Sequence, residues 1–157
     1  MDIGGPTPAI LSNIAFNSAT KRHRPNLKVG QVVICHVTAS DPLFDIEVSC
    51  EDPTSQKDWV TNEVYFGALP EGGLMLTLPP SVALELMAKN NPIFPVLGRH
   101  FKPFELAIGA NGRIYVKTAE GEYLRAILIR LALMRCYSMS LEDFEKLCQD
   151  MEHRLSV

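Results

Sequence analysis

Apolar and polar residues alternate along the first half of the chain. The clearest case is residues 44–50, where Phe44, Ile46, Val48 and Cys50 share one face. Residues 9–16 and 31–40 are also apolar segments, and turn-forming residues separate the three. A period of two is typical of half-buried strands. We therefore expect short antiparallel strands with turns at the spacing of a small barrel.

The pattern changes at Gly72-Gly73, where we place a domain boundary. A strand is predicted at 74–78, followed by a helix at 80–89. Asn90-Asn91-Pro92 ends this helix because proline cannot continue it, and one further helical turn is expected at 93–97. The chain thus divides into a first domain of strands, residues 1–72, and a second domain, residues 73–157.

Two strands in 104–117 and two helices complete the second domain. The first helix is expected at 119–136, and its predicted core stripe is Leu124, Ile127, Leu128, Leu131 and Ala132. The second is expected at 140–154, with Ser140 as its N-cap. The order of elements predicts an α+β domain with a three-stranded sheet and helices on one side.

A tetrapeptide of the form GxxG separates the two strands of 104–117. Gly109-Ala110-Asn111-Gly112 fits a hairpin, with Asn111-Gly112 forming a primed turn in which both residues have positive φ. A phosphate-binding loop is the alternative, because glycines let a nucleic-acid backbone approach closely. Tyr115 lies on the sheet face opposite to its apolar neighbours, where it would pack against another domain or stack on a base.

Composition and charge exclude several classes of protein. The 157 residues carry a net charge of −3, so any contact with nucleic acid must use a local basic patch. No apolar run reaches the ~20 residues that span a bilayer, and we expect no membrane partner. The four cysteines, Cys35, Cys50, Cys136 and Cys148, lack metal-ligand spacing and are expected to be reduced, buried thiols.

The residues with catalytic potential do not form a recognisable site. Acidic pairs fall at turns or at a helix start, and the four histidines lack metal-ligand spacing. His36 falls in a predicted strand, where a hydrogen-bonded structural role is expected. We expect no enzymatic activity, no metal and no cofactor.

The strongest candidate for a binding site is a basic loop between predicted strands. It contains Lys21, Arg22, His23, Arg24 and Lys28. The arginines would give bidentate contacts with phosphates, and the lysines would supply point charges. A solvated surface loop without a ligand explains the same residues, and the sequence leaves both readings open.

Aromatic residues could add base stacking to such a loop. The candidates are Phe44, Tyr65, Phe66 and Tyr115. Phe44 alternates with apolar residues and is expected in the core. Packing is the favoured role for Tyr115.

Two stretches resemble one known family. ATKRHRPNLKVG at 19–30 and GANGRIYVK at 109–117 resemble ribosomal RNA-processing protein 40, a cap subunit of the RNA exosome. The first stretch separates this family from its KH-containing paralogue, and the second, with the GxNG signature, is common to both. Tyr115 stands where the family usually has tryptophan.

The resemblance implies a partial S1-type OB barrel followed by a KH domain, with the N-terminal domain and the first barrel strands of the family lacking. It implies a non-catalytic subunit that braces a ring of RNase-PH-like subunits, contacts other cap subunits, and guides single-stranded RNA toward the channel. The nucleus, nucleolus and cytoplasm are the implied locations. The alternative is a structural scaffold module that never contacts RNA.

The family context also changes the expectation for the GxxG tetrapeptide. In KH domains that grip RNA, GxxG joins two helices, whereas here it joins two strands. The junction between helices is Asn90-Asn91-Pro92, which has no glycine. Gly109, Asn111, Gly112 and Tyr115 are therefore expected to form a structural hairpin at a domain interface.

Overall fold

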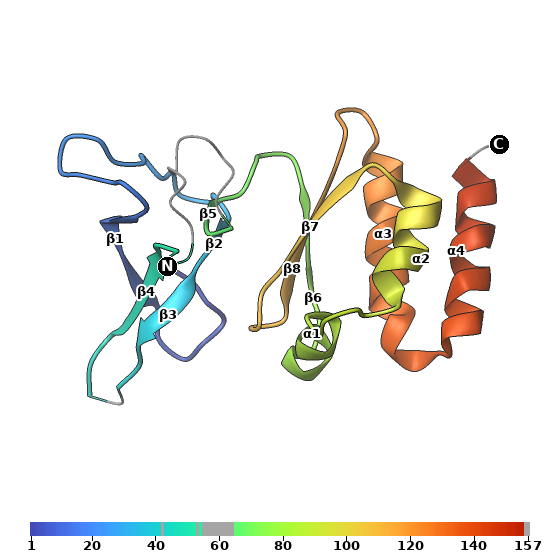
Figure 1. The fold of residues 1–157 in the computed structure, drawn as a ribbon, viewed down its shortest axis with the longest axis horizontal. Coiled ribbons are helices and arrows are strands. Elements are labelled where there is room, and N and C mark those ends of the chain that lie inside the picture. Colours follow the sequence, from blue (N-terminus) through green and yellow to red (C-terminus); the bar gives the residue numbers. More distant parts are fainter. Residues whose placement is uncertain (42, 53, 55–64, 156–157) are drawn as a thin grey trace. The chain divides into compact units, whose positions relative to one another are not determined.

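The computed structural model describes residues 1–41, 43–52, 54 and 65–155, and the chain divides into two compact units. The first unit is Met1–Glu71 and the second unit is Gly72–Val157 (Figure 1). The division falls beside the glycine pair at which the sequence changes character.

The first unit is built from short strands. β1 (Ala9–Phe16), β4 (Ile46–Cys50) and β3 (His36–Ala39) form one sheet in the order β1-β4-β3. β2 (Val33–Ile34) and β5 (Gly67–Ala68) form a separate two-stranded ladder.

The sequence predicted that all strands of the first unit are antiparallel. This prediction is wrong for one pair of strands. β3–β4 and β2–β5 are antiparallel, but β1 runs parallel to β4, from Ala9 opposite Ile46 to Leu11 opposite Val48. A parallel pair needs a long connection to return the chain to the same end. The segment between β1 and β4 contains β2 and β3 and provides that length.

The expectation that Phe44 belongs to the core is wrong, because its side chain is 76% exposed. The alternating pattern suggested a strand from residue 44, but β4 begins only at Ile46. Phe44 instead lies in a turn at Asp41, whose backbone oxygen accepts a hydrogen bond from the Phe44 N–H at 3.2 Å. The Asp41 side chain stabilises the same turn by accepting from the Leu43 N–H at 2.8 Å.

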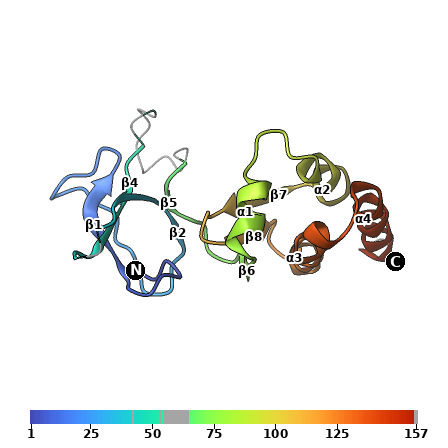
Figure 2. The same cartoon turned by 90° about the horizontal axis from the view of Figure 1, so that it is seen from below.

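The second unit has a three-stranded antiparallel sheet. Its strands are β6 (Leu74–Thr77), β8 (Arg113–Thr118) and β7 (Phe104–Ile108), in the order β6-β8-β7. The helices are α1 (Pro80–Leu86), α2 (Ile93–Phe101), α3 (Tyr123–Arg135) and α4 (Leu141–Leu155). In both views α2, α3 and α4 lie on one side of this sheet (Figure 1 and Figure 2).

One large hydrophobic cluster fills the space between that sheet and its helices. Its buried members are Leu76, Leu78, Leu86, Val96, Leu97, Phe101, Ile114, Val116, Ile129, Ala132, Leu133, Cys136, Phe144, Cys148 and Met151. Alternate side chains of β6 and β8 point into this cluster. This is the burial pattern of a sheet covered on one face.

α2 is longer than the single turn predicted at 93–97. It runs through Gly98 to Phe101, whose side chain is fully buried in the cluster. Burial of an aromatic side chain outweighs the roughly 1 kcal/mol that glycine costs inside a helix. Pro92 is the N-cap of α2, and the side-chain oxygen of Asn91 before it accepts the Ile93 N–H at 3.0 Å.

The predicted core stripe of the helix that follows β8 is confirmed at Ala132 and at the partly buried Leu128, and is wrong at its other three residues. α3 begins at Tyr123 rather than 119, and its buried residues are Ala126, Ile129, Ala132 and Leu133. Leu124, Ile127 and Leu131 are exposed. Apolar residues occur on both faces of α3, so periodicity could not identify the face that packs on the sheet.

α4 matches its prediction closely. The Ser140 hydroxyl oxygen accepts the Asp143 N–H at 3.2 Å, which is the expected N-cap. The same hydroxyl donates to the Asp143 carboxylate at 2.8 Å. The buried side chains Phe144, Cys148 and Met151 recur at helical spacing along one face.

Candidate functional site

The basic loop (Lys21, Arg22, His23, Arg24 and Lys28) connects β1 to β2 in the first unit. The side chains of its four lysines and arginines are all exposed, whereas Pro25 at its centre is buried. The buried proline anchors the loop, and its fixed φ limits the conformations available to the neighbouring cations.

Short-range hydrogen bonds hold both ends of the basic loop. The Thr20 N–H donates to the His23 carbonyl at 2.7 Å, and the His23 N–H donates back to the Thr20 hydroxyl at 3.1 Å. At the other end, the Gln31 N–H donates to the Lys28 carbonyl, and the Lys28 N–H donates to the Gln31 side chain, both at 3.2 Å. The loop is therefore folded locally before any ligand binds.

The cations of the basic loop are electrostatically available. Among the described residues, no carboxylate forms an ion pair with Lys21, Arg22, Arg24 or Lys28. Exposed and unpaired guanidinium groups can bind phosphate oxygens without first breaking an internal salt bridge.

An aromatic cluster lies elsewhere in the first unit. Phe66 is 4.9 Å from His36 and 5.0 Å from Tyr65, measured between ring centroids. Tyr65 is 62% exposed, so its ring has a face open to a stacking base. Tyr65 and Phe66 were both candidates from the sequence. Their contact with His36 could not be predicted from the sequence pattern.

The expected structural hydrogen bond of His36 is not formed at Nδ1. That nitrogen is buried and has no hydrogen-bond partner in the described part of the chain. The ring instead packs against Phe66. An unpaired buried nitrogen is costly, and it leaves a polar atom beside the aromatic cluster.

The basic loop and the aromatic cluster are at opposite ends of the β2–β5 ladder. The Leu69 N–H donates to the Val32 carbonyl at the end near the loop, and Ile34 pairs with Gly67 at the end near Phe66.

In the second unit, Gly109–Gly112 forms the tight turn between β7 and β8. The Gly112 N–H donates to the Gly109 carbonyl at 3.0 Å, and the Gly109 N–H donates to the Arg113 carbonyl at 2.8 Å. Gly112 alone has positive φ, at 84°, so the primed turn predicted at Asn111-Gly112 is wrong. A three-residue loop that ends in a left-handed glycine needs only one such residue.

The hairpin turn is also in close contact with the end of β6. The Leu78 N–H donates to the Gly112 carbonyl at 2.8 Å. A Cβ atom at Gly112 would lie 2.1 Å from the Leu78 carbonyl oxygen. The glycine is therefore enclosed by its own unit and has no open face toward a phosphate.

Tyr115 packs inside the second unit and is only 6% exposed. Its hydroxyl oxygen accepts the Gly73 N–H at 3.0 Å. Burial raises the pKa of this phenol, the hydrogen bond from Gly73 lowers it, and the charge of Glu105 raises it. A Cβ at Gly73 would lie 2.2 Å from the Tyr115 ring, so the ring occupies the space that this glycine leaves.

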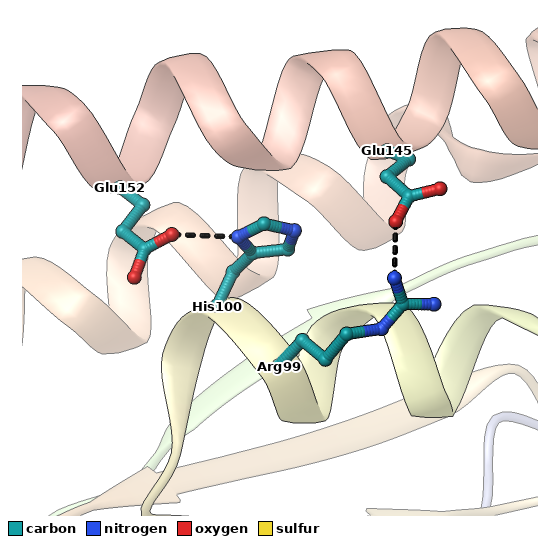
Figure 3. A network of polar contacts seen from close by, with 4 residues as sticks. All are labelled: Arg99, His100, Glu145 and Glu152. Atoms are coloured by element: carbon teal, nitrogen blue, oxygen red, sulfur yellow. Dashed lines mark hydrogen bonds and ion pairs between the residues drawn. The ribbon is translucent and has the colours of Figure 1, made fainter.

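Two polar contacts join α2 to α4 (Figure 3). His100 Nδ1 lies 2.6 Å from a Glu152 carboxylate oxygen, and the Arg99 guanidinium pairs with Glu145. Both acids project from α4 toward α2, so the contacts fasten the two helices rather than form a cleft. Within the described ranges, no group of three or more His, Cys, Asp and Glu side chains is placed to hold a metal.

No helix in the described part of the chain is both long and apolar enough to cross a bilayer. All four cysteines are free thiols; Cys50, Cys136 and Cys148 are buried and Cys35 is partly exposed.

The order of elements and the two matching family models define the class of protein. Residues 1–60 match a family model described as exosome complex component RRP40, S1 domain, and residues 73–122 match a KH domain. The chain is thus a mixed α+β protein with an S1-type domain followed by a KH domain. A crystal structure described as that of an exosome complex RNA-binding protein has the same fold, with a TM-score of 0.68, 19% identity, and coverage of 99% of this chain and 86% of that one.

The chain belongs to the family of exosome complex component RRP40. It is 33% identical over 155 residues to the Schizosaccharomyces pombe member, covering 99% of this chain and 61% of that relative. It is 38% identical over 111 residues to the Saccharomyces cerevisiae member, covering 70% of this chain and 43% of the relative. The Homo sapiens member is 31% identical over 117 residues, covering 74% of this chain and 40% of the relative. The chain therefore spans less than two thirds of the length of these relatives.

Proposed function

We propose that this chain acts as a non-catalytic RNA-binding cap subunit of the RNA exosome. In this role it braces the ring of RNase-PH-like subunits beside other cap subunits and guides single-stranded RNA toward the central channel. Family membership supports assembly into an exosome, because the relatives are themselves named exosome components. The observation that carries the RNA contact is the preorganised basic loop with unpaired cations.

The basic loop suits the phosphate backbone rather than the bases. Lys21, Arg22 and Arg24 are exposed on a segment held at both ends, which favours contact with phosphates of any sequence. Tyr65 offers a ring face for stacking, which is equally tolerant of sequence. These features favour weak guidance of a passing strand over recognition of one RNA.

Catalysis is assigned to other subunits in this proposal. Two acids of the second unit, Glu145 and Glu152, pair with Arg99 and His100 and so join α4 to α2. Gly112 of the GxxG tetrapeptide is enclosed by the end of β6, which supports a structural role for the hairpin rather than a phosphate contact.

Crosslinking of RNA to a reconstituted exosome tests the proposal. Ultraviolet crosslinks from a single-stranded RNA that enters the assembly should map to the basic loop or to Tyr65. Crosslinks confined to other subunits, in an assembly that contains this chain, would favour the purely structural scaffold. The net charge of −3 is the observation that supports that second function. Failure to co-purify with RNase-PH-like subunits would contradict both.

A further inference from the structure

α3 has a second apolar face that points away from the core. Its exposed members are Tyr123 at 64%, Leu124 at 57%, Ile127 at 42%, Leu131 at 40% and Met134 at 42%. The opposite face already packs into the hydrophobic cluster through Ile129 and Leu133. A helix that is apolar on both faces is normally covered on both, so this outer face lacks the cover that its composition calls for.

The exposed residues form one continuous stripe, which we name the α3 outer stripe. Leu124, Ile127, Leu131 and Met134 recur at intervals of three and four residues, which places them in one row along the helix. The row rises roughly 15 Å, at about 1.5 Å per residue. Anchors at i, i+3, i+4 and i+7 of a docked helix span about 10.5 Å, so the row is long enough to receive them.

Two arginines border the α3 outer stripe. At about 100° per residue, Arg130 falls on one side of the row and Arg135 on the other. Both are exposed, and neither forms an ion pair with any described residue. α3 itself contains no Asp or Glu, and the acid at its N-cap, Glu122, pairs with Arg125 at 2.7 Å.

We propose that the α3 outer stripe docks an amphipathic helix of a partner protein, whose apolar face is flanked by acidic residues. Apolar anchors would fill the spaces along the row, and the acids would pair with Arg130 and Arg135. Tyrosine and arginine, both present here, are the residues enriched where binding energy concentrates.

The charges beside the stripe favour a helix with acidic flanks over a second copy of the chain and over an anionic membrane. A second copy of the chain would place arginines opposite arginines with no acid on α3 to compensate, which is unfavourable. An anionic membrane typically requires a cluster of about four to eight basic residues, and only two border the stripe. The surface lies in the second unit and does not involve the basic loop, so it stands independently of the RNA contact.

The test uses two designed helical peptides with the same leucine face and either glutamate or lysine at the flanking positions. Binding of each labelled peptide to the full chain is measured by fluorescence anisotropy. The glutamate peptide should bind about tenfold more tightly than the lysine peptide. The double variant Ile127→Asp with Leu131→Asp should bind the glutamate peptide about tenfold more weakly. The control variant, Leu84→Asp with Leu141→Asp, changes exposed apolar sites outside the stripe and should bind it unchanged.

A charge-reversal variant keeps the test independent of the apolar changes. Arg130→Glu with Arg135→Glu should reverse the preference between the two peptides. Equal binding of both peptides, or binding insensitive to the Ile127 and Leu131 changes, would overturn the proposal. It would also be overturned if those changes instead abolished self-association of the chain, or its binding to phosphatidylcholine vesicles with about 30% phosphatidylserine.

Discussion

At the scale of single residues, Gly112 determines how the hairpin meets the rest of the second unit. It combines a positive φ of 84° with a carbonyl oxygen that accepts a hydrogen bond from the Leu78 N–H. Any side chain there meets both a strained backbone and the Leu78 carbonyl oxygen at 2.1 Å. The requirement for glycine thus comes from β6 as well as from the turn.

Gly112→Ala should lower the free energy of unfolding by about 3 kcal/mol, because the left-handed backbone costs ~1 kcal/mol and the collision with Leu78 adds to it. Gly121→Ala is the matched control, since Gly121 has a φ of 88° with nothing within 4 Å of the added carbon. The control should cost only about 1 kcal/mol. Equal losses for the two variants in urea unfolding would show that the Leu78 contact is unimportant.

Because the thiol of Cys148 is buried, the free energy of unfolding of the second unit should decrease at alkaline pH. Burial raises the pKa of this thiol from 9.0 to about 11, and the charge of Glu145 adds to the increase. The folded state favours the protonated thiol, so its contribution to stability is fully present below pH 9. This contribution is lost as the pH rises toward 11. Cys148→Ala should therefore have a smaller stability deficit at pH 11 than at pH 8, by on the order of 2 kcal/mol. A deficit that stays constant from pH 8 to pH 11 would contradict this assignment.

Several individual residues were predictable from the sequence, and others were not. Ser140 was identified as an N-cap because capping chemistry is local. Phe44 was wrongly assigned to the core because the alternating pattern of β4 extends to residues before the strand begins. Those residues form a turn that the Asp41 side chain stabilises. The partner of Tyr115 could not be predicted, because Gly73 is 42 residues away in sequence and only the folded sheet brings it near.

At the scale of elements, tertiary contacts decide what local patterns leave open. The strands and helices of the second unit occur in the predicted order because their periodicities are strong. The length of α2 and the buried face of α3 were not predictable. α2 extends because Phe101 is buried, and α3 offers two apolar faces between which the sequence cannot choose.

The two α2–α4 contacts allow a double-mutant cycle with an internal control. His100 is 15% exposed and Glu152 is 45% exposed, whereas Arg99 and Glu145 are 61% and 43% exposed. At pH 7 the His100→Ala and Glu152→Ala cycle should give a coupling of about 1 kcal/mol, because its pair is less screened by water. The Arg99→Ala and Glu145→Ala cycle should give about 0.3 kcal/mol. A larger coupling for the more exposed pair in thermal or urea unfolding would contradict this ranking.

At the scale of the whole molecule, the two units have unequal cores. The large hydrophobic cluster lies entirely in residues 76–155. The apolar residues buried in the described part of the first unit are Ala9, Phe16, Pro25, Val48 and Cys50. Stability need not be uniform across a chain, and the unit with fewer buried apolar groups opens more readily.

Hydrogen exchange of the full chain should therefore distinguish the two units. Backbone amides of β1, β3 and β4 should exchange faster than those of β8 and α3, by about tenfold or more. The comparison uses amides that are hydrogen-bonded in the structure, so that solvent exposure alone does not produce the difference. Equal protection of the two units would contradict the prediction.

The measurement that most directly tests the RNA-binding proposal is the salt dependence of RNA affinity for two triple variants. Binding of the full chain to a fluorescent single-stranded oligoribonucleotide should be weak and should fall with increasing salt. Lys21→Ala, Arg22→Ala and Arg24→Ala together should nearly abolish it and make the slope of log affinity against log salt shallower by about 2. Lys89→Ala, Lys146→Ala and Arg154→Ala together remove the same charge from the second unit and should leave both quantities nearly unchanged. If the two triple variants bind RNA equally well, the basic loop is not the RNA contact and the proposed function is contradicted at its central point.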